Sequence, residues 1–337
     1  IRRLLNQSKS LVFNLDKVGY ASDLVGIQSS TGSERHQLLQ VDLTNFEETS
    51  LALERADPDL IFHLAAESHV DRSIDNPRIF IDNNIIGTLN LLEAARGHLT
   101  NLNQQRKNNF RLLHISTDEV FGSLGDQGSF TEKSQYDPRS PYSASKAASD
   151  HLVNAWFHTY ELPIIKTNCS NNFGPWQFPE KLIPLVIQKC LRQEGIPVYG
   201  NGKNIRDWLY VEDHIDGLLL AITKGTIGKS YCIGGYGEKS NIEVVLDICK
   251  LLDKKVPLSF SYESLIEFVK DRPGHDKRYS VDSSLAKEEL GWEAKFNYEE
   301  GLENTVDWYI NNIEWCNNLS IKSGYTGSRI GLTQKNN

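Results

Sequence analysis

Short apolar runs and helical patterns alternate along the first half of the chain. Two segments, from Pro77 to Leu99 and from Pro141 to Tyr160, have apolar residues spaced as on a helix face. Strands that are apolar on both faces and separated by helices are typical of a parallel sheet with helices on both sides. We therefore predict an α/β fold with a doubly wound parallel sheet. Five apolar runs have the length of buried strands: residues 10–16, 36–43, 58–68, 109–116 and 162–168.

Beyond Asn168 the pattern changes to short elements joined by loops rich in Gly, Pro and polar residues. Such loops often build a substrate pocket over a rigid sheet. We predict a first domain over residues 1–171 and a smaller, mixed α/β substrate-binding domain over 172–320. Part of about 208–235 is expected to pack back on the first domain, and 321–337 form a polar tail.

Composition narrows the function classes. The 337 residues carry a net charge of −8, whereas nucleic-acid and anionic membrane surfaces are bound by clustered Lys and Arg. This negative net charge therefore predicts no nucleic-acid partner. No apolar run approaches the roughly 18 residues of a membrane span, so we also expect no membrane association. The five cysteines are odd in number and lack CxxC spacing, so a reducing cytoplasm and no metal site are expected.

Asp16 ends the first apolar run. In a dinucleotide-binding unit an acidic residue there binds the adenosine ribose hydroxyls and selects NAD over NADP. An Asp after a strand is more often a turn or cap residue. The Gly-rich turn expected about 20 residues earlier is missing, and the sequence opens in a helical pattern without Met, so we expect a fragment that lacks the first strand and this turn. The glycines after Cys232 lack the GxGxxG spacing and are interpreted as a substrate-side loop.

Tyr142 and Lys146 are four residues apart within a predicted helix and would therefore project from one face. An ammonium group beside a phenol favours the phenolate, which makes the tyrosine a usable general base. A second Tyr and Lys pair, Tyr199 and Lys203, encloses two glycines, so a helix is improbable there.

Four polar residues, from Ser116 to Glu119, follow the apolar run that ends at Ile115. Active sites of open α/β sheets lie at the carboxyl ends of the strands, so these side chains are candidates for chemistry beside Tyr142. A helix cap is an equally simple interpretation, because Ser, Thr and Asp commonly cap helices and acidic residues suit a first turn.

These motifs together resemble the extended short-chain dehydrogenase/reductase family and, within it, the nucleotide-sugar 4,6-dehydratases that act on dTDP-glucose. The similarity runs in family order along nearly the whole chain. The stretches that carry it are HLAAESHVDRS (63–73), STDEVFG (116–122), PYSASKAASD (141–150), NCSNNFGPWQFPEKLIP (168–184), NIRDWLYVEDH (204–214) and DRPGHDKRY (271–279).

The resemblance implies a Rossmann-like first domain that binds NAD and a lyase reaction in which dTDP-glucose becomes dTDP-4-keto-6-deoxyglucose. NAD⁺ would oxidise the sugar at C4 and return the hydride to C6 after water is eliminated across C5 and C6. Tyr142 would be the base, with Lys146 lowering its pKa and binding the nicotinamide ribose, and Thr117 would hold the O4 oxygen. Glu119 would remove the C5 proton, and Asp118, protonated, would give its proton to the departing C6 hydroxyl.

The same resemblance implies the binding residues. Beside Asp16, the cofactor would contact Asp42, Leu43, Leu64, Ala65, Ala66, Ser68, Asn83, Ser116, Tyr142, Lys146 and Asn172. The nucleotide sugar would contact Ser68, Thr117, Asn171, Lys181, Leu182, Pro197, Tyr199, Arg206, Asn241, Asp271 and His275. Arg206 is the expected diphosphate ligand, because its planar fork of donors suits phosphate oxygens; the alternative is a surface Arg paired with Asp207.

Several alternatives stay open at this stage. By family resemblance the related 4-epimerases usually lack the Asp118–Glu119 pair and GDP-mannose 4,6-dehydratases favour NADP, whereas an NAD-dependent CDP-glucose 4,6-dehydratase is harder to exclude. Without the Gly-rich turn, the chain could also be a non-catalytic remnant that binds nucleotide sugar. A homodimer formed through the two predicted helices is implied by the resemblance alone.

Overall fold

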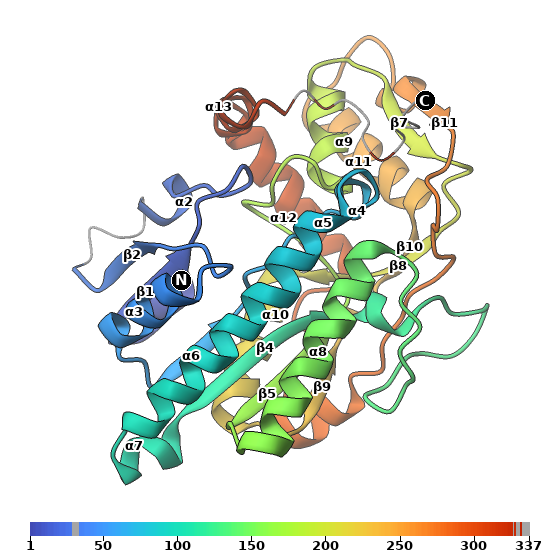
Figure 1. The fold of residues 1–337 in the computed structure, drawn as a ribbon. Helices are drawn as coiled ribbons and strands as arrows, with labels where there is room; N and C mark the ends of the chain where they lie inside the picture. The colour runs from blue at the N-terminus through green and yellow to red at the C-terminus, as the bar shows by residue number, and fades with distance from the viewer. Residues whose placement is uncertain (29–33, 326, 328–330, 332–337) are drawn as a thin grey trace, which may run out of the picture.

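A four-stranded parallel sheet forms the centre of the computed structural model, which describes residues 1–28, 34–325, 327 and 331 (Figure 1). Its strand order is β3-β4-β5-β9. The bounds are Leu60–His63 for β3, Arg111–Thr117 for β4, Ile164–Cys169 for β5 and Ser230–Ile233 for β9. Every neighbouring pair is parallel, so the carboxyl ends of all four strands meet at one edge. The predicted α/β class is confirmed.

Two further parallel strands, β1 (Val12–Asp16) and β2 (His36–Gln40), pair with each other and lie beside this sheet (Figure 1). In the described part of the chain no backbone hydrogen bond joins β1 to β3. All five residues of β1 are only half-buried, which differs from the strand buried on both faces that the sequence predicts. The reason is that one edge of β1 has no strand partner there.

Helices cover both faces of the central sheet, and alternate strand residues explain how. Leu112 of β4 packs toward α6 (Gly87–Asn101) and α8 (Pro141–Tyr160). Its neighbour Leu113 packs toward α10 (Val211–Lys224) on the other face. Both side chains are fully buried, as expected for a strand in the middle of a doubly wound sheet.

The predicted helix from Pro77 to Leu99 is interrupted. It begins as α5 (Pro77–Phe80), widens into a π-helical turn at Ile81–Ile86, and continues as α6. Asn84 in that turn bonds the backbone N–H and C=O of Glu67 through its side chain, at 2.8 and 3.0 Å. Single π-turns inside helices are frequent at functional sites. Here the turn brings a side chain to the loop that follows β3.

A second core is built by α9 (Leu182–Leu191), α11 (Asn241–Lys255) and α12 (Tyr298–Asn311). Helices α9 and α11 lie at the upper right of Figure 1, and α12 runs toward the centre. Two small sheets, β10-β8-β6 and β11-β7, flank these helices. Their bounds are Asn171–Phe173 for β6, Ile196–Tyr199 for β7, Ile205–Tyr210 for β8, Glu238–Ser240 for β10 and Ile266–Val269 for β11. Tyr199 ends strand β7 and Gly200 follows with a φ of 58°, so Tyr199 and Lys203 do not share a helix, as predicted.

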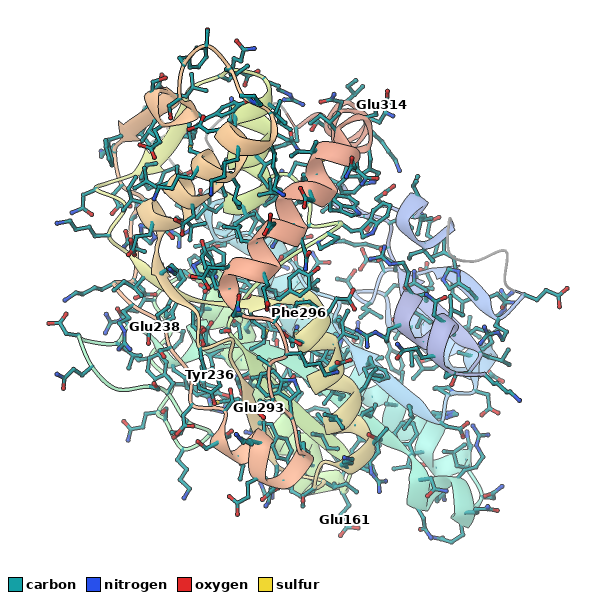
Figure 2. The ribbon with its side chains drawn as sticks, turned by 180° about the vertical axis from the view of Figure 1, so that it is seen from behind. Glu161, Tyr236, Glu238, Glu293, Phe296 and Glu314 are labelled. Carbon is teal, nitrogen blue, oxygen red and sulfur yellow. The ribbon has the colours of Figure 1, made fainter. Side chains whose placement is uncertain are left out.

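Asp213 connects this second core to the central sheet. Its carboxylate accepts the backbone N–H groups of Lys295 and Phe296 at 3.1 and 3.0 Å, and its carbonyl accepts the Trp292 indole N–H at 2.9 Å. Phe296 lies just ahead of α12 in the view from behind (Figure 2). The segment around β9 and α10 therefore packs on the central sheet although it comes late in the chain.

The remaining helices are short or peripheral. Among the described residues, no helix is long and apolar enough to cross a membrane. Residues 321–323 of the expected tail belong to the last helix, α13, and most of the tail lies outside the described residues. The remaining bounds are Arg2–Gln7 (α1), Val25–Gln28 (α2), Phe46–Ala56 (α3), Val70–Asp75 (α4), Gln104–Asn109 (α7), Ile313–Ser323 (α13), Asp118–Phe121 (η2), Tyr262–Leu265 (η3) and Ala286–Leu290 (η4).

Candidate active site

The polar run after β4 forms a tight 3₁₀ turn, Asp118–Phe121, at the carboxyl edge of the central sheet. The Thr117 hydroxyl caps this turn by accepting the Glu119 N–H at 3.2 Å, and it donates to Asp118 Oδ1 at 3.2 Å. The cap that the sequence allowed is therefore present. It does not exclude chemistry, because the same turn holds the two carboxylates beside each other at the edge where ligands bind in open sheets.

Helix α8 begins beside this turn and presents Tyr142 and Lys146 on one face. Ser140 and Ser143 form a capping box at its start, with Pro141 in the first turn, so the beginning of the helix is well defined. Tyr142 is 8 % exposed and Lys146 5 % exposed. The Lys146 ammonium donates to the Ile115 carbonyl at 2.8 Å, which ties α8 to β4 just ahead of the polar turn.

Asp118 and Glu119 differ in their surroundings. Asp118 is fully buried and its Oδ2 has no hydrogen-bond partner. Burial, with the neighbouring charges of Glu119 and Asp207, raises the pKa of Asp118 well above its usual range. Burial also raises the pKa of Glu119, but the positive charges of Arg272, Arg206 and Lys181 oppose that effect. Of the two neighbouring carboxyl groups, Asp118 is therefore the one that holds a proton more readily.

Tyr142 differs from the sequence-based expectation. Burial and the charge of Glu119 raise the pKa of Tyr142 above its usual range, although the Thr117 hydroxyl opposes this. We expected Lys146 to lower it. The Lys146 ammonium is instead bonded to the Ile115 carbonyl, and Lys146 itself is buried, which lowers its own pKa. A further positive charge next to the phenol would be needed to favour the phenolate at neutral pH.

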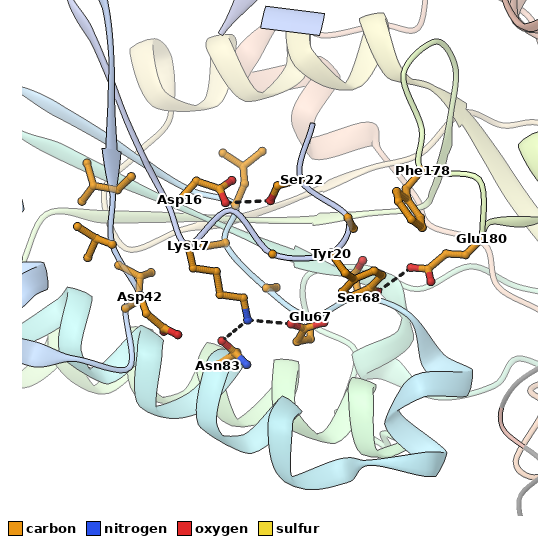
Figure 3. Close-up of a pocket in the computed structure, with 18 of the residues that line it drawn as sticks. Asp16, Lys17, Tyr20, Ser22, Asp42, Glu67, Ser68, Asn83, Phe178 and Glu180 are labelled. Atoms are coloured by element: carbon orange, nitrogen blue, oxygen red, sulfur yellow. Dashed lines mark hydrogen bonds and ion pairs between the residues drawn. The ribbon is translucent and has the colours of Figure 1, made fainter. Parts of the chain in front are cut away.

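A cavity of about 410 Å³ lies between the loops that follow β1, β2 and β3 and the loop before α9 (Figure 3). Eight of the residues predicted to bind the cofactor line it, together with Lys181, which was predicted to bind substrate. The eight are Asp16, Asp42, Leu43, Leu64, Ala65, Ala66, Ser68 and Asn83. The other four, Ser116, Tyr142, Lys146 and Asn172, do not line this cavity and lie near the polar turn or on β6.

Sequence reasoning missed several polar residues of this cavity. Lys17 donates to Glu67 at 2.9 Å and to Asn83 at 2.7 Å (Figure 3). Tyr20 donates to Glu180 at 2.8 Å (Figure 3). These contacts join elements far apart in the sequence and could not be predicted from it. The only signal for Lys17 and Tyr20 was their place just after the strand that ends at Asp16.

Asp16 combines both interpretations made from the sequence. Its carboxylate accepts the Val18 N–H at 2.6 Å and the Ser22 hydroxyl at 2.9 Å, so it stabilises its own turn (Figure 3). It also lines the cavity at the carboxyl end of β1. The position suits an acidic ligand for ribose hydroxyls.

Arg206 is buried, 4 % exposed, on β8. It donates to the carbonyls of Ile205 and Asp276 and its guanidinium lies 4.3 Å from the centre of the Tyr279 ring. The alternative of a surface Arg paired with Asp207 is wrong, since neighbouring strand residues point to opposite faces. Asp207 instead accepts the Gly237 N–H at 3.0 Å.

Other predicted substrate residues also occur around Arg206 and Lys181, and two of them pair with acids. His275 contacts Asp271 at 2.6 Å and Tyr199 donates to Asp71 at 2.8 Å. Lys181 donates to the Ser68 carbonyl at 2.6 Å. Asn171 has a buried Oδ1 without a partner.

Three more substrate candidates have plain structural surroundings. Leu182 packs against the second core, Pro197 lies on β7 and Asn241 starts α11.

Arg272 was missed although it lies inside a quoted motif. It is paired with Asp71 at 3.2 Å, and its Nε is buried without a partner. Its charge opposes the pKa rise of Glu119. A buried donor without a partner is costly, so this nitrogen is a candidate ligand contact. Among the described residues, no group of three or more His, Cys, Asp or Glu side chains is arranged to hold a metal ion.

Comparison with known proteins gives consistent matches. A family profile described as GDP-mannose 4,6 dehydratase matches residues 1–305. A probable dTDP-glucose 4,6-dehydratase of Sinorhizobium fredii is 50% identical over 333 residues, covering 99% of this chain and 95% of the relative. A dTDP-glucose 4,6-dehydratase of Xanthomonas campestris is 50% identical over 324 residues, covering 96% and 92%.

Solved structures agree with these matches. A dTDP-glucose 4,6-dehydratase of Bacillus anthracis, in complex with NAD, is 38% identical with a TM-score of 0.83, covering 94% of this chain and 93% of that one. A dTDP-glucose 4,6-dehydratase of Streptomyces venezuelae, with NAD and TYD bound, is 37% identical with a TM-score of 0.85, covering 94% of each chain.

Proposed function

The chain belongs to the dTDP-glucose 4,6-dehydratase family, and we propose that it is an NAD-dependent lyase that converts dTDP-glucose to dTDP-4-keto-6-deoxyglucose. One observation supports this most directly. Asp118 and Glu119 are adjacent carboxyl groups next to the Tyr142 phenol, and their surroundings raise the pKa of Asp118 strongly while nearby cations oppose the rise for Glu119. An elimination of water needs one acid and one base at neighbouring atoms of the sugar.

Tyr142 is proposed as the base that takes the C4 hydroxyl proton, while Thr117 holds the same oxygen by a hydrogen bond. The new C4 ketone acidifies the C5 proton, which Glu119 then removes. Asp118 gives its proton to the departing C6 hydroxyl, so that water leaves. Burial supports this order, since a fully buried Asp118 keeps its proton until a leaving group accepts it.

The cavity residues fit NAD at its adenosine end. Asp16 ends β1 and Asp42 follows β2, so both place carboxylates at the cavity for ribose hydroxyls, and Leu43 and Leu64 add apolar surface. Lys146 and Ser116 are proposed to hold the nicotinamide end. Bound NAD⁺ would supply the hydride acceptor for C4 and the hydride donor for C6, and its positive ring would favour the Tyr142 phenolate.

The nucleotide sugar is proposed to bind between Lys181, Arg206 and Arg272. The guanidinium groups of buried Arg206 and half-buried Arg272 act on Glu119 and suit a diphosphate, because each offers a planar fork of donors. The Arg272 Nε–H, which has no partner, would donate to a phosphate oxygen, and a sugar hydroxyl would donate to the Asn171 Oδ1, which also has no partner.

The test is turnover with NAD⁺ and dTDP-glucose, followed by mass spectrometry. A product lighter by one water supports the proposal, and unchanged substrate contradicts it. Parallel reactions with CDP-, UDP- and GDP-glucose test which nucleotide base the protein prefers in its substrate. Faster turnover of CDP-glucose would assign the chain to the CDP-sugar enzymes, and tight binding of dTDP without turnover of any sugar would indicate a non-catalytic binder.

We further propose a cytoplasmic homodimer. Four large apolar side chains on α5, the π-helical turn Ile81–Ile86 and α8 are exposed, which suits a helical interface; they are Ile79, Ile81, Ile86 and Tyr160. The five free cysteines suit a reducing compartment. Light scattering tests the dimer, and Ile81→Glu should convert it to a monomer, whereas the exposed Leu51→Glu should not.

A further inference from the structure

Asp150 lies one helical turn beyond Lys146 on α8 and has no role in the proposed chemistry. Its side chain is fully buried. Four hydrogen-bond or ionic contacts converge on it from two strands and a loop. They come from His114 at 3.1 Å, Ser116 at 2.8 Å, Tyr136 at 2.6 Å and the Lys166 ammonium at 3.9 Å. A buried carboxylate is retained only when it is fully paired, so this arrangement is specific to the ionised form.

The network reaches the active site along two paths. Ser116 immediately precedes Thr117, so its bond to Asp150 fixes the end of β4 from which the polar turn starts. Lys146 shares the helix face of Asp150 and bonds the Ile115 carbonyl, one residue before Ser116. Because the Ser116 hydroxyl donates to Asp150, its oxygen faces any further ligand as an acceptor.

The charges of the network are defined by their surroundings. Burial would raise the pKa of Asp150, but the His114 hydrogen bond and the charges of Lys166 and Lys146 outweigh it and hold that pKa well below its usual range. Burial lowers the pKa of His114 to about 4, so this ring is neutral. Burial lowers the pKa of Lys146, and Asp150 is the main charge that opposes this.

We propose that Asp150 is a positioning residue for the reaction: its carboxylate fixes the end of β4 against α8 and supplies the fixed negative charge that balances the Lys146 ammonium. The inference rests on the proposed function of the site. The titratable groups that surround Asp150 and Lys146 on all packed elements are His63, His114, Tyr136, Tyr142, His151, Lys166, Cys169 and Cys232.

Asp150→Asn tests the charge. The amide oxygen of Asn can still accept the Ser116 and Tyr136 hydroxyls and its NH₂ can donate to neutral His114, so the fold is expected to remain. We expect kcat for dTDP-glucose to fall about 10–100-fold with KM changed less than about threefold, as for residues that orient catalytic groups. The alkaline limb of the kcat profile, where Lys146 deprotonates, should move to lower pH by about one pH unit.

Ser149→Ala is the matched control. Ser149 is fully buried on the same helix and donates to the carbonyls of Asn84 and Ser145, but it carries no charge. In Ser149→Ala the alkaline limb of the kcat profile should stay at its wild-type pH. An equal movement of this limb in Ser149→Ala and in Asp150→Asn would overturn the inference. An unmoved limb in folded Asp150→Asn would also overturn it.

Two further results separate the possible failures. If Asp150→Asn does not fold, Tyr136→Phe is tested instead: it removes the hydroxyl that donates to Asp150 and accepts from Lys166, and it leaves the carboxylate charge. This variant should lower kcat about 2–10-fold with an unmoved alkaline limb, and a wild-type kcat would contradict the inference. Absence of turnover in the wild-type chain would contradict the proposed function, whereas wild-type turnover with an unchanged Asp150→Asn profile would contradict only the role of Asp150.

Discussion

Replacing Glu119 by Gln separates the two halves of the proposed reaction. Gln keeps the size of the side chain and removes the base for the C5 proton. A positioned general base contributes about 10²–10⁴-fold to a rate, which corresponds to about 3–5 kcal/mol in the activation free energy. We therefore expect turnover of dTDP-glucose to fall by that factor while oxidation at C4 continues.

The structure adds a second effect of opposite sign. The Glu119 charge contributes to the raised pKa of Tyr142 and of Asp118. Removing it lowers both pKa values, so a larger fraction of Tyr142 is deprotonated at any pH below its pKa. The pH profile for C4 oxidation should then be shifted in Glu119→Gln, with its rise about one pH unit lower than in the wild type.

The assay is a single-turnover reaction stopped at successive times across a pH series, with mass spectrometry of the sugar nucleotides. The variant should accumulate the oxidised sugar that has kept its C6 hydroxyl. Glu293→Gln is a matched control, because this side chain is 69% exposed and pairs with Lys287 on the surface (Figure 2). Wild-type turnover in Glu119→Gln, or an unmoved pH profile for the oxidation, would refute the reasoning.

Three further predictions concern the acid, the diphosphate site and one close backbone contact. Asp118→Asn should lower kcat about 10²–10⁴-fold because the leaving group loses its proton donor, measured as product formation, and an unchanged kcat would contradict the role. Arg206→Met should weaken dTDP binding by about 1.5–3 kcal/mol in calorimetry, and unaltered affinity would place the diphosphate elsewhere. Gly235→Ala should lower the free energy of unfolding by about 1–3 kcal/mol in denaturant titrations, because the added Cβ would lie 2.0 Å from the Trp208 carbonyl oxygen. Gly97→Ala is the control: a Cβ there would meet no atom within 4 Å on helix α6, so this variant should raise the free energy of unfolding by about 0.5–1 kcal/mol.

The strands and helices of the first half were predictable because their signals are local. A buried strand and an amphipathic helix need only neighbouring residues to be recognised. Helix α8 runs from Pro141 to Tyr160 as predicted, and each of the five predicted apolar runs coincides with a parallel strand, β1 to β5. The π-turn at Ile81–Ile86 was not predictable, because Asn84 forms it with the distant Glu67 backbone.

The candidate site was predictable where motif and sheet edge coincide. Thr117, Asp118, Glu119 and Tyr142 were identified because a strand end and a helix start were both visible in the sequence. Their roles remain proposals. Arg272 was not predicted as a site residue. What marks it as a candidate ligand contact is a buried nitrogen without a partner, and that is a property of the packed structure.

The amino-acid sequence by itself determined the α/β class, the family and the residue types at the sheet edge, because periodicity and motif spacing are written along the chain. Only the tertiary structure decided how those residues are charged. Asp118 and Glu119 are neighbours with nearly equal intrinsic pKa values. Their difference comes from burial and from Arg206, Arg272 and Lys181, which folding brings from distant segments. Electrostatic interactions depend on distance and burial in space, and neither can be read from separation along the chain.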